Sequence, residues 1–111
     1  MFKIDPAPTF RADVSLSAPG QTEPNRLSIE WQHLDRKQLT EWIDALAAAQ
    51  LSDVDGLAQV IAGWDGVVDH QGQNVPYSKD RLQALLCAYH AAGAELVRGY
   101  VRALTESRVG N

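Results

Sequence analysis

The first third of the chain alternates apolar and polar residues in two short segments, which a turn-rich stretch separates. Every second residue is apolar in residues 9–16, and the same period returns in residues 27–31. This alternation is typical of a half-buried β-strand, and the stretch APGQTEPN at residues 18–25 is rich in turn formers. The pattern predicts an antiparallel hairpin over residues 9–33, with an apolar side formed by Phe10, Val14, Leu16, Leu27, Ile29 and Trp31.

An isolated hairpin is marginally stable in water, so its apolar side needs a cover, and the patterns that follow are helical. Asp35 and Gln38 have the spacing of a capping box, which predicts a helix from Arg36 to about Gln50. Ser52 is a candidate N-cap for a short second helix, which we expect to end at Gly63.

The remaining residues predict a loop and two more helices. Residues 64–76 contain glycines and a proline without a clear period, so we expect an irregular loop there. Ser78 is a candidate N-cap for the third helix. We expect the helical run over residues 79–108 to break between Ala88 and Gly93, because a glycine inside a helix costs about 1 kcal/mol relative to alanine.

The arm before the hairpin completes the expected organisation. Pro6 and Pro8 restrict the residues before them to extended conformations, so residues 1–8 are predicted to form an extended arm. A chain of 111 residues, 45% of them hydrophobic, is long enough to bury one core. We therefore expect a single domain over residues 1–111 with an α+β fold, mostly helical, and with the helical region over residues 35–108.

Charge and cysteine content exclude several classes of protein. The net charge is −4, and residues 1–50 and 51–111 each carry five basic and seven acidic side chains. Binding to nucleic acid requires clustered Lys and Arg, so we expect no nucleic-acid partner. No segment has the length and apolarity of a membrane span. Cys87 is the single cysteine, which rules out an intrachain disulfide and favours a cytosolic protein.

No residue pattern predicts catalysis. His33, His70 and His90 lie far apart in the sequence, and none belongs to a known metal-ligand spacing. The glycines do not form a phosphate-binding loop. Asp69 beside His70 is a weak acid–base candidate, because neighbouring side chains diverge. We expect no catalytic residue, no cofactor, no metal ion and no enzymatic activity.

The fourth predicted helix is more apolar than a core-facing helix needs to be. Leu96, Tyr100 and Ala103 lie along one edge of its apolar arc, whereas Val97 and Val101 lie along the other. The arc spans roughly 200°, against about 100° or more for a typical surface helix. Leu96, Tyr100 and Ala103 are therefore candidates for a partner-binding edge, and a helix enclosed in the core is the equally open alternative.

Trp64 is the fourth candidate for partner binding. The simplest interpretation of Trp31, Trp42 and Trp64 is that all three fill the core. Trp64 lies between a predicted helix end and a predicted loop, which makes it the best of the three for an interface anchor.

Several segments in a fixed order resemble the tail assembly chaperones of long-tailed bacteriophages. They are MFKIDPAPTF at the start, the hairpin, the helix after HLDRKQL, the turn GWDGV, and PYSKDRLQALLCAYHAAGAELVRGYVRAL. The order of the segments carries the resemblance, because no single segment is specific.

This resemblance implies a protein that binds the tape measure protein and keeps it soluble until the major tail protein polymerises around it. It also implies action in the cytoplasm of the bacterial host, absence from the finished virion, and often a longer version made by ribosomal frameshifting. The major tail protein and further copies of the chain remain open as additional partners. Two alternatives also stay open: a structural tail completion or minor virion protein, and a small adaptor whose hairpin edge pairs with another protein strand.

Overall fold

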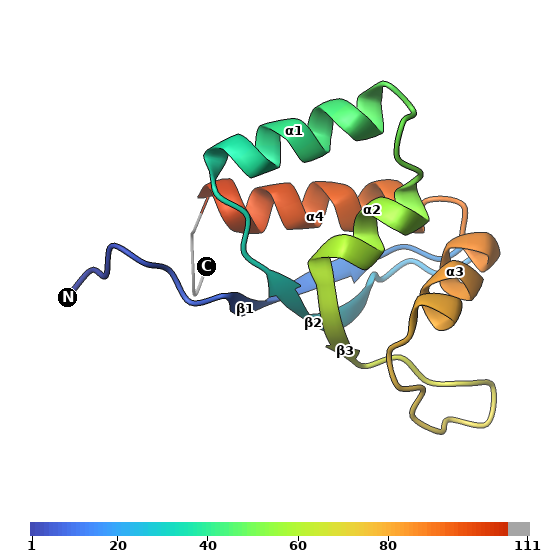
Figure 1. Ribbon diagram of the computed structural model, residues 1–111. Helices are drawn as coiled ribbons and strands as arrows, with labels where there is room; N and C mark the ends of the chain where they lie inside the picture. The colour runs from blue at the N-terminus through green and yellow to red at the C-terminus, as the bar shows by residue number, and fades with distance from the viewer. Residues whose placement is uncertain (107–111) are drawn as a thin grey trace.

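The computed structural model describes residues 1–106. Two strands open the fold and a third lies between the second and third helices (Figure 1). In chain order the elements are β1 (Thr9–Leu16), β2 (Asn25–Gln32), α1 (Arg36–Ala47), α2 (Asp53–Val60), β3 (Ile61–Asp65), α3 (Lys79–Ala88) and α4 (Ala92–Glu106). The predicted α+β class, with an N-terminal hairpin and four helices, is confirmed. The last part of the predicted helical region, including Arg108, lies outside the described residues.

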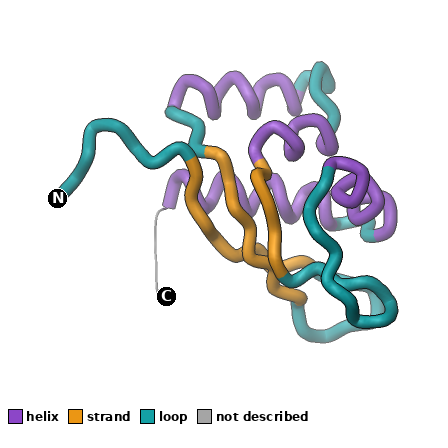
Figure 2. The backbone as a smooth tube through the Cα atoms, turned by 60° about the horizontal axis from the view of Figure 1, so that its bottom comes forward, coloured by secondary structure: helices purple, strands orange, loops and turns teal. Residues whose placement is uncertain are grey.

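The sheet is antiparallel throughout, in the order β1-β2-β3, with β1 at one margin and β3 at the other (Figure 2). Phe10 lies opposite Trp31, so the apolar residues of both hairpin strands share one face. Val14, Leu16, Leu27, Ile29 and Trp31 are buried on this face, and Phe10 packs against the same cluster.

The third strand, β3, is a difference from the prediction. Ile61 was expected inside the second helix and Trp64 in an irregular loop, but α2 ends at Val60 and residues 61–65 are extended. Trp64 lies opposite Ile29 and Ile61 opposite Trp31, with a register shift between Glu30 and Trp31. Pairing with β2 explains why residues 61–65 are extended. One edge of β2 bonds to β1, and the backbone N–H and C=O groups of its other edge need hydrogen-bond partners, which β3 supplies.

The predicted caps occupy the helix starts. The Asp35 carboxylate accepts a hydrogen bond of 2.8 Å from the Gln38 backbone N–H, and the Gln38 side chain accepts one of 3.0 Å from the Asp35 N–H. The Ser52 and Ser78 hydroxyls each accept a hydrogen bond of 3.1 Å from the backbone three residues on. The predicted break between the last two helices is also confirmed, because α3 ends at Ala88 and α4 begins at Ala92.

The helices cover the apolar face of the sheet and close one core. The side chains that are completely or almost completely buried come from the sheet and from three of the four helices: Ile29, Trp31, Leu57, Val60, Leu82, Leu96 and Tyr100. Gly99 brings α4 close to β1, since a Cβ atom at this position would lie 2.8 Å from Val14 Cγ2.

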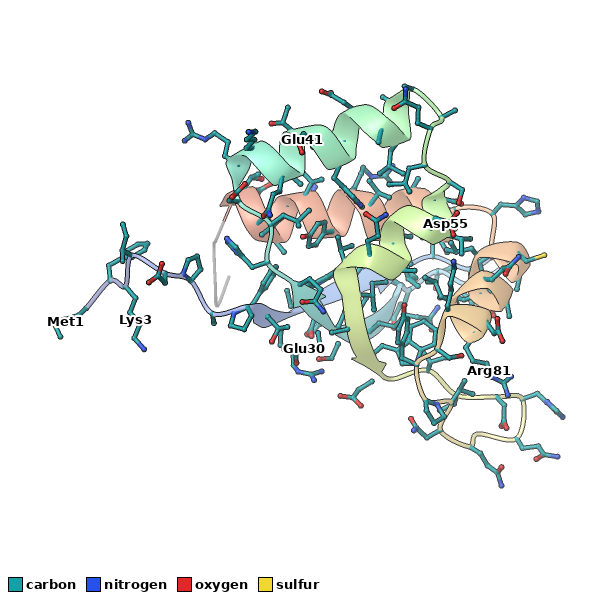
Figure 3. All side chains as sticks on the ribbon, viewed as in Figure 1. Met1, Lys3, Glu30, Glu41, Asp55 and Arg81 are labelled. Carbon is teal, nitrogen blue, oxygen red and sulfur yellow. The ribbon has the colours of Figure 1, made fainter. Side chains whose placement is uncertain are left out.

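The opposite face of the sheet is polar. Arg11 on β1 donates hydrogen bonds of 3.0 Å across this face to Glu30 on β2 and to Asp65 on β3. Glu30 lies on the lower part of the view in Figure 3, on the side away from α1. Since the side chains of Arg11 and Asp65 are substantially exposed, these ion pairs hold the charged side chains in place on the surface but add little to the stability of the fold.

Candidate partner-binding surfaces

Two of the predicted partner-binding residues, Leu96 and Tyr100, lie on the core side of α4 and are fully buried. The Tyr100 ring contacts the rings of Trp31 and Trp42, with centroid distances of 4.8 Å and 5.3 Å. Its hydroxyl donates a hydrogen bond of 2.7 Å to the backbone carbonyl of Gln32, and burial raises its pKa to about 12. These contacts are those of a core residue.

Trp64 is also mostly enclosed, with 7% of its surface exposed. Its indole N–H donates a hydrogen bond of 2.8 Å to the carbonyl of Val75, and its ring meets the edge of Tyr77 at a centroid distance of 5.0 Å. Trp64 therefore holds the loop after β3 against the sheet. The loop itself is more regular than predicted, with a backbone bridge between Val68 and Asn74.

Ala103 is the one predicted site residue that is partly exposed. Binding through the four residues stays a prediction, and burial adds a condition to it. A partner reaches Leu96, Tyr100 and Trp64 only if the packing around them opens.

The opposite edge of α4 is the more accessible apolar edge. Val97, Val101 and Leu104 are partly exposed although they pack against the core cluster. They are spaced by four and three residues and therefore lie along one side of the helix. The helical pattern left open whether an edge was spare, and it could not show which edge turned toward the sheet.

The arm before β1 carries the most exposed apolar side chains of the described chain. Met1, Phe2 and Ile4 are each at least 95% exposed. Figure 3 shows Met1 and Lys3 at the far end of the arm, away from the body of the fold. In the sequence, the apolar Phe2 and Ile4 alternate with the charged Lys3 and Asp5.

An ion pair joins the starts of two helices on another side of the molecule. Lys79 Nζ lies 2.8 Å from Asp55 Oδ1, and this hydrogen bond holds the pKa of the Asp55 carboxyl below its usual range. The same contact raises the pKa of Lys79. Both side chains are more than half exposed, so this ion pair links the starts of α2 and α3 but adds little stability.

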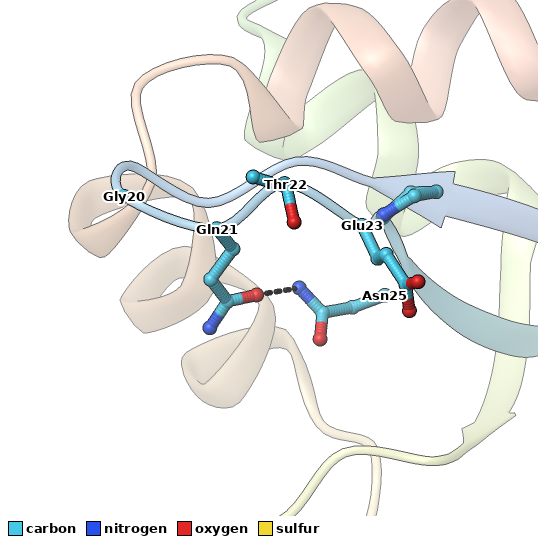
Figure 4. Close-up of a pocket in the computed structure, with 6 residues that line it drawn as sticks. Gly20, Gln21, Thr22, Glu23 and Asn25 are labelled. Carbon is cyan, nitrogen blue, oxygen red and sulfur yellow. Dashed lines mark hydrogen bonds between the residues drawn. The ribbon is translucent and has the colours of Figure 1, made fainter.

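The β1–β2 loop forms a shallow depression without a reactive group. Its lining residues are Gly20 to Asn25, and the Asn25 side chain amide donates a hydrogen bond of 2.8 Å to Gln21 Oε1 (Figure 4). Within residues 1–106, no group of three or more His, Cys, Asp or Glu side chains is placed to hold a metal ion. Asp69 accepts hydrogen bonds from the backbone of Gln71 and Gln73, which gives it a structural role in a turn.

In the part of the chain that the structure describes, no helix combines the length and the apolarity needed to cross a membrane.

The described surfaces include an exposed apolar arm and a polar sheet face. The sequence model of the phage tail assembly chaperone family matches residues 1–111, the whole chain. The chain therefore belongs to the phage tail assembly chaperones. No curated protein and no solved structure matches it significantly.

Proposed function

We propose that this chain binds the tape measure protein during tail assembly and keeps it soluble until the tail tube polymerises around it. The protein acts by binding alone, without catalysis, in the cytoplasm of the bacterial host, and it is absent from the finished virion. Membership of the chaperone family supports the general role. The exposure of Phe2 and Ile4 on the arm is the observation that supports direct contact with an apolar client.

The arm suits a client with an apolar stripe. Burying a Phe or Ile side chain that was fully exposed gains about 1.5–3 kcal/mol, so Phe2 and Ile4 together supply a useful part of a binding energy. Lys3 and Asp5 would keep their charges in water on the other side of the extended segment. Copies that are joined to one another would also gain avidity for one long client.

The accessible edge of α4 is a second contact area for the same client. Val97, Val101 and Leu104 form a stripe that an amphipathic helix can cover, as in helix-in-groove recognition. Ala103 is partly exposed on the same helix and is the predicted site residue that fits this proposal without any opening of the core.

The test is co-expression of the full chain with the tape measure protein from the same genome, followed by affinity capture and a comparison of client solubility. The double variant Phe2→Ser/Ile4→Ser removes the apolar side of the arm, whereas Lys3→Ser/Asp5→Ser changes the same number of arm residues and keeps that side. All four side chains are exposed, so neither variant disturbs the core.

We expect the wild type and Lys3→Ser/Asp5→Ser to keep the tape measure protein soluble, and Phe2→Ser/Ile4→Ser to lose most of the captured client. Equal capture by all three proteins would show that the arm is not the contact. Failure of the wild type to capture or solubilise the client would contradict the proposed function itself. A mass-spectrometric inventory of purified virions tests the predicted absence, since a structural tail protein would be found there.

A further inference from the structure

Within residues 1–106, no strand pairs with the outer edge of β1, so the backbone groups along this edge have no strand partner there. The Pro8 carbonyl accepts a hydrogen bond of 2.9 Å from the His33 N–H, which fixes the phase of the ladder between β1 and β2. Hydrogen-bonded pairs alternate along an antiparallel ladder, so the even-numbered residues of β1 direct their N–H and C=O groups toward β2. The odd-numbered residues Thr9, Arg11, Asp13 and Ser15 direct theirs to the free edge.

This free edge has a definite end on each side. At one end, the Ser17 N–H and hydroxyl both donate hydrogen bonds to the Glu95 carboxylate, at 3.0 Å and 2.8 Å. At the other end, β1 begins at Thr9. Between these ends, a pairing strand would find the groups of Thr9 to Ser15 available, and long unprotected edges of this kind are sites of strand addition.

The helix over β1 leaves this edge accessible. Gly99 places α4 directly against Val14 on the apolar face of the sheet. The side chains of Arg11 and Asp13 on the other face are 48% and 52% exposed. The side chain of Ala12, at the middle of β1, is only partly buried, so a neighbouring strand could bury it further.

We propose that the free edge of β1 pairs with β1 of a second copy of this chain, antiparallel, about a two-fold axis at Ala12. In this register Thr9 lies opposite Ser15 of the second copy, and Arg11 lies opposite Asp13 of the second copy. All four outward-facing residues then pair, giving about eight hydrogen bonds between the two chains. Each strand presents the same edge to the other, as a two-fold interface requires.

Charge selects this register over its neighbours. A shift of the axis to residue 11 would place Arg11 opposite Arg11 of the second copy, and a shift to residue 13 would place Asp13 opposite Asp13. Like charges directly opposite in a sheet are destabilising, whereas opposite charges stabilise the pair. The central register alone joins opposite charges and uses the whole free edge.

The apolar face gains from the same pairing. Phe10 would lie opposite Val14 of the second copy, and Ala12 opposite its own counterpart. Phe10 and Ala12 are only partly buried in the single chain, so the second copy covers surface that the fold leaves open. The two copies of α4 would approach each other above the small Ala12 side chains. The side of α4 that faces Ser17 carries both signs of charge, so the two helices would not meet with like charges alone. Its charged residues are Glu95, Arg98, Arg102 and Glu106.

Sedimentation equilibrium of the full chain over a range of concentrations tests the pairing. Ser15→Pro removes one outward N–H from an edge where proline is tolerated, and Ser15→Ala is its matched control because it keeps the N–H. We expect dimers for the wild type and Ser15→Ala, and a dissociation constant raised on the order of tenfold or more for Ser15→Pro. Circular dichroism confirms that each variant is folded.

A charge exchange identifies the register. Asp13→Arg places Arg opposite Arg in a homodimer, and Arg11→Asp places Asp opposite Asp, so each variant alone should dimerise roughly tenfold or more weakly than the wild type. Mixed in equal amounts, the two variants restore both Arg–Asp pairs and should form heterodimers. Asp13→Arg alone disturbs little in its own chain, since the contact of Asp13 with Arg26 is a loose 4.0 Å.

A wild type that stays monomeric at every concentration would overturn the proposal. So would dimers that survive Ser15→Pro and both charge reversals unchanged, because the interface would then lie elsewhere. Both results are independent of client capture, so the failure of this proposal is distinguishable from the failure of the proposed function.

Discussion

The Tyr100 hydroxyl on α4 lies 2.7 Å from the backbone carbonyl of Gln32, the last residue of β2, and donates a hydrogen bond to it. The ring of the same residue meets Trp31 on β2 and Trp42 on α1. It also stacks against Phe10 on β1 at a centroid distance of 6.5 Å. One side chain therefore joins two strands to the two longest helices.

Replacing Tyr100 by Phe keeps the ring contacts and removes the hydroxyl. The Gln32 carbonyl then loses a partner in a part-buried place, and we expect the free energy of unfolding to fall by about 1–3 kcal/mol. Urea denaturation measures this change. Tyr77→Phe is the matched control, because it removes a hydroxyl from a part-buried tyrosine outside this contact. Equal effects for the two variants would mean that the Tyr100 hydrogen bond contributes nothing of its own.

Stability should also depend on Tyr100 at alkaline pH. Burial raises the pKa of its phenol to about 12 from 10.0, so the unfolded chain releases this proton at a lower pH than the folded chain does. The contribution is complete below pH 10 and is lost as the pH rises from 10 to about 12, by on the order of 2–3 kcal/mol. Urea denaturation at a series of pH values should show a smaller fall for Tyr100→Phe, and parallel profiles would contradict this assignment.

Gly99→Ala should destabilise the protein although alanine favours helices. The added Cβ would lie 2.8 Å and 3.0 Å from the two methyl carbons of Val14, so α4 must move away from β1. We expect a loss of about 1–3 kcal/mol from overpacking, which outweighs the gain of about 1 kcal/mol in helix propensity. Thermal and urea unfolding measure it. In a Val14→Ala background the penalty should shrink or change sign, and an unchanged penalty would exclude this contact as the cause.

Gly93→Ala provides a contrast on the same helix. The added Cβ would lie 2.5 Å from Asp53 Oδ2, which is the end of an exposed and rotatable side chain. Because Asp53 can turn aside, we expect stability to stay within about 0.5 kcal/mol of the wild type. A loss as large as that of Gly99→Ala would show that the Asp53 carboxylate has a fixed role at the start of α4.

Removal of the α1 cap should have a measurable cost. Asp35→Ala eliminates the hydrogen bond that the Asp35 carboxylate accepts from the Gln38 N–H, but it keeps the backbone N–H that donates to the Gln38 side chain. We expect about 1 kcal/mol less stability in urea denaturation. Asp44→Ala removes an exposed carboxylate from the interior of the same helix and serves as the control. Similar losses for both variants would indicate a general charge effect in place of capping.

Features set by neighbours in the sequence could be predicted from the residues alone. The alternation in residues 9–16 depends only on which side chains share a face, and it identified the buried side of the hairpin. The caps at Asp35, Ser52 and Ser78 are equally local, because a cap bonds to a backbone group three residues on.

Features set by distant partners could not be predicted in this way. Ile61 continues a plausible helical stripe and Trp64 falls in a predicted loop, yet residues 61–65 form a strand through pairing with β2, thirty or more residues earlier in the chain. The apolar arc of α4 shows the same limit. Its pattern is compatible with either edge facing inward, and the contacts of Tyr100 with Trp31 and Trp42 decide the choice.

The separation of the arm from the core has a consequence for how this protein can evolve. Phe2 and Ile4 are exposed and contribute nothing to the buried cluster, so substitutions there carry no penalty in folding. If the arm contacts the client as proposed, a lineage could alter it to follow a drifting client while the packing around Tyr100 stays constant. Exchange of that short segment alone would then transfer client preference between related chains.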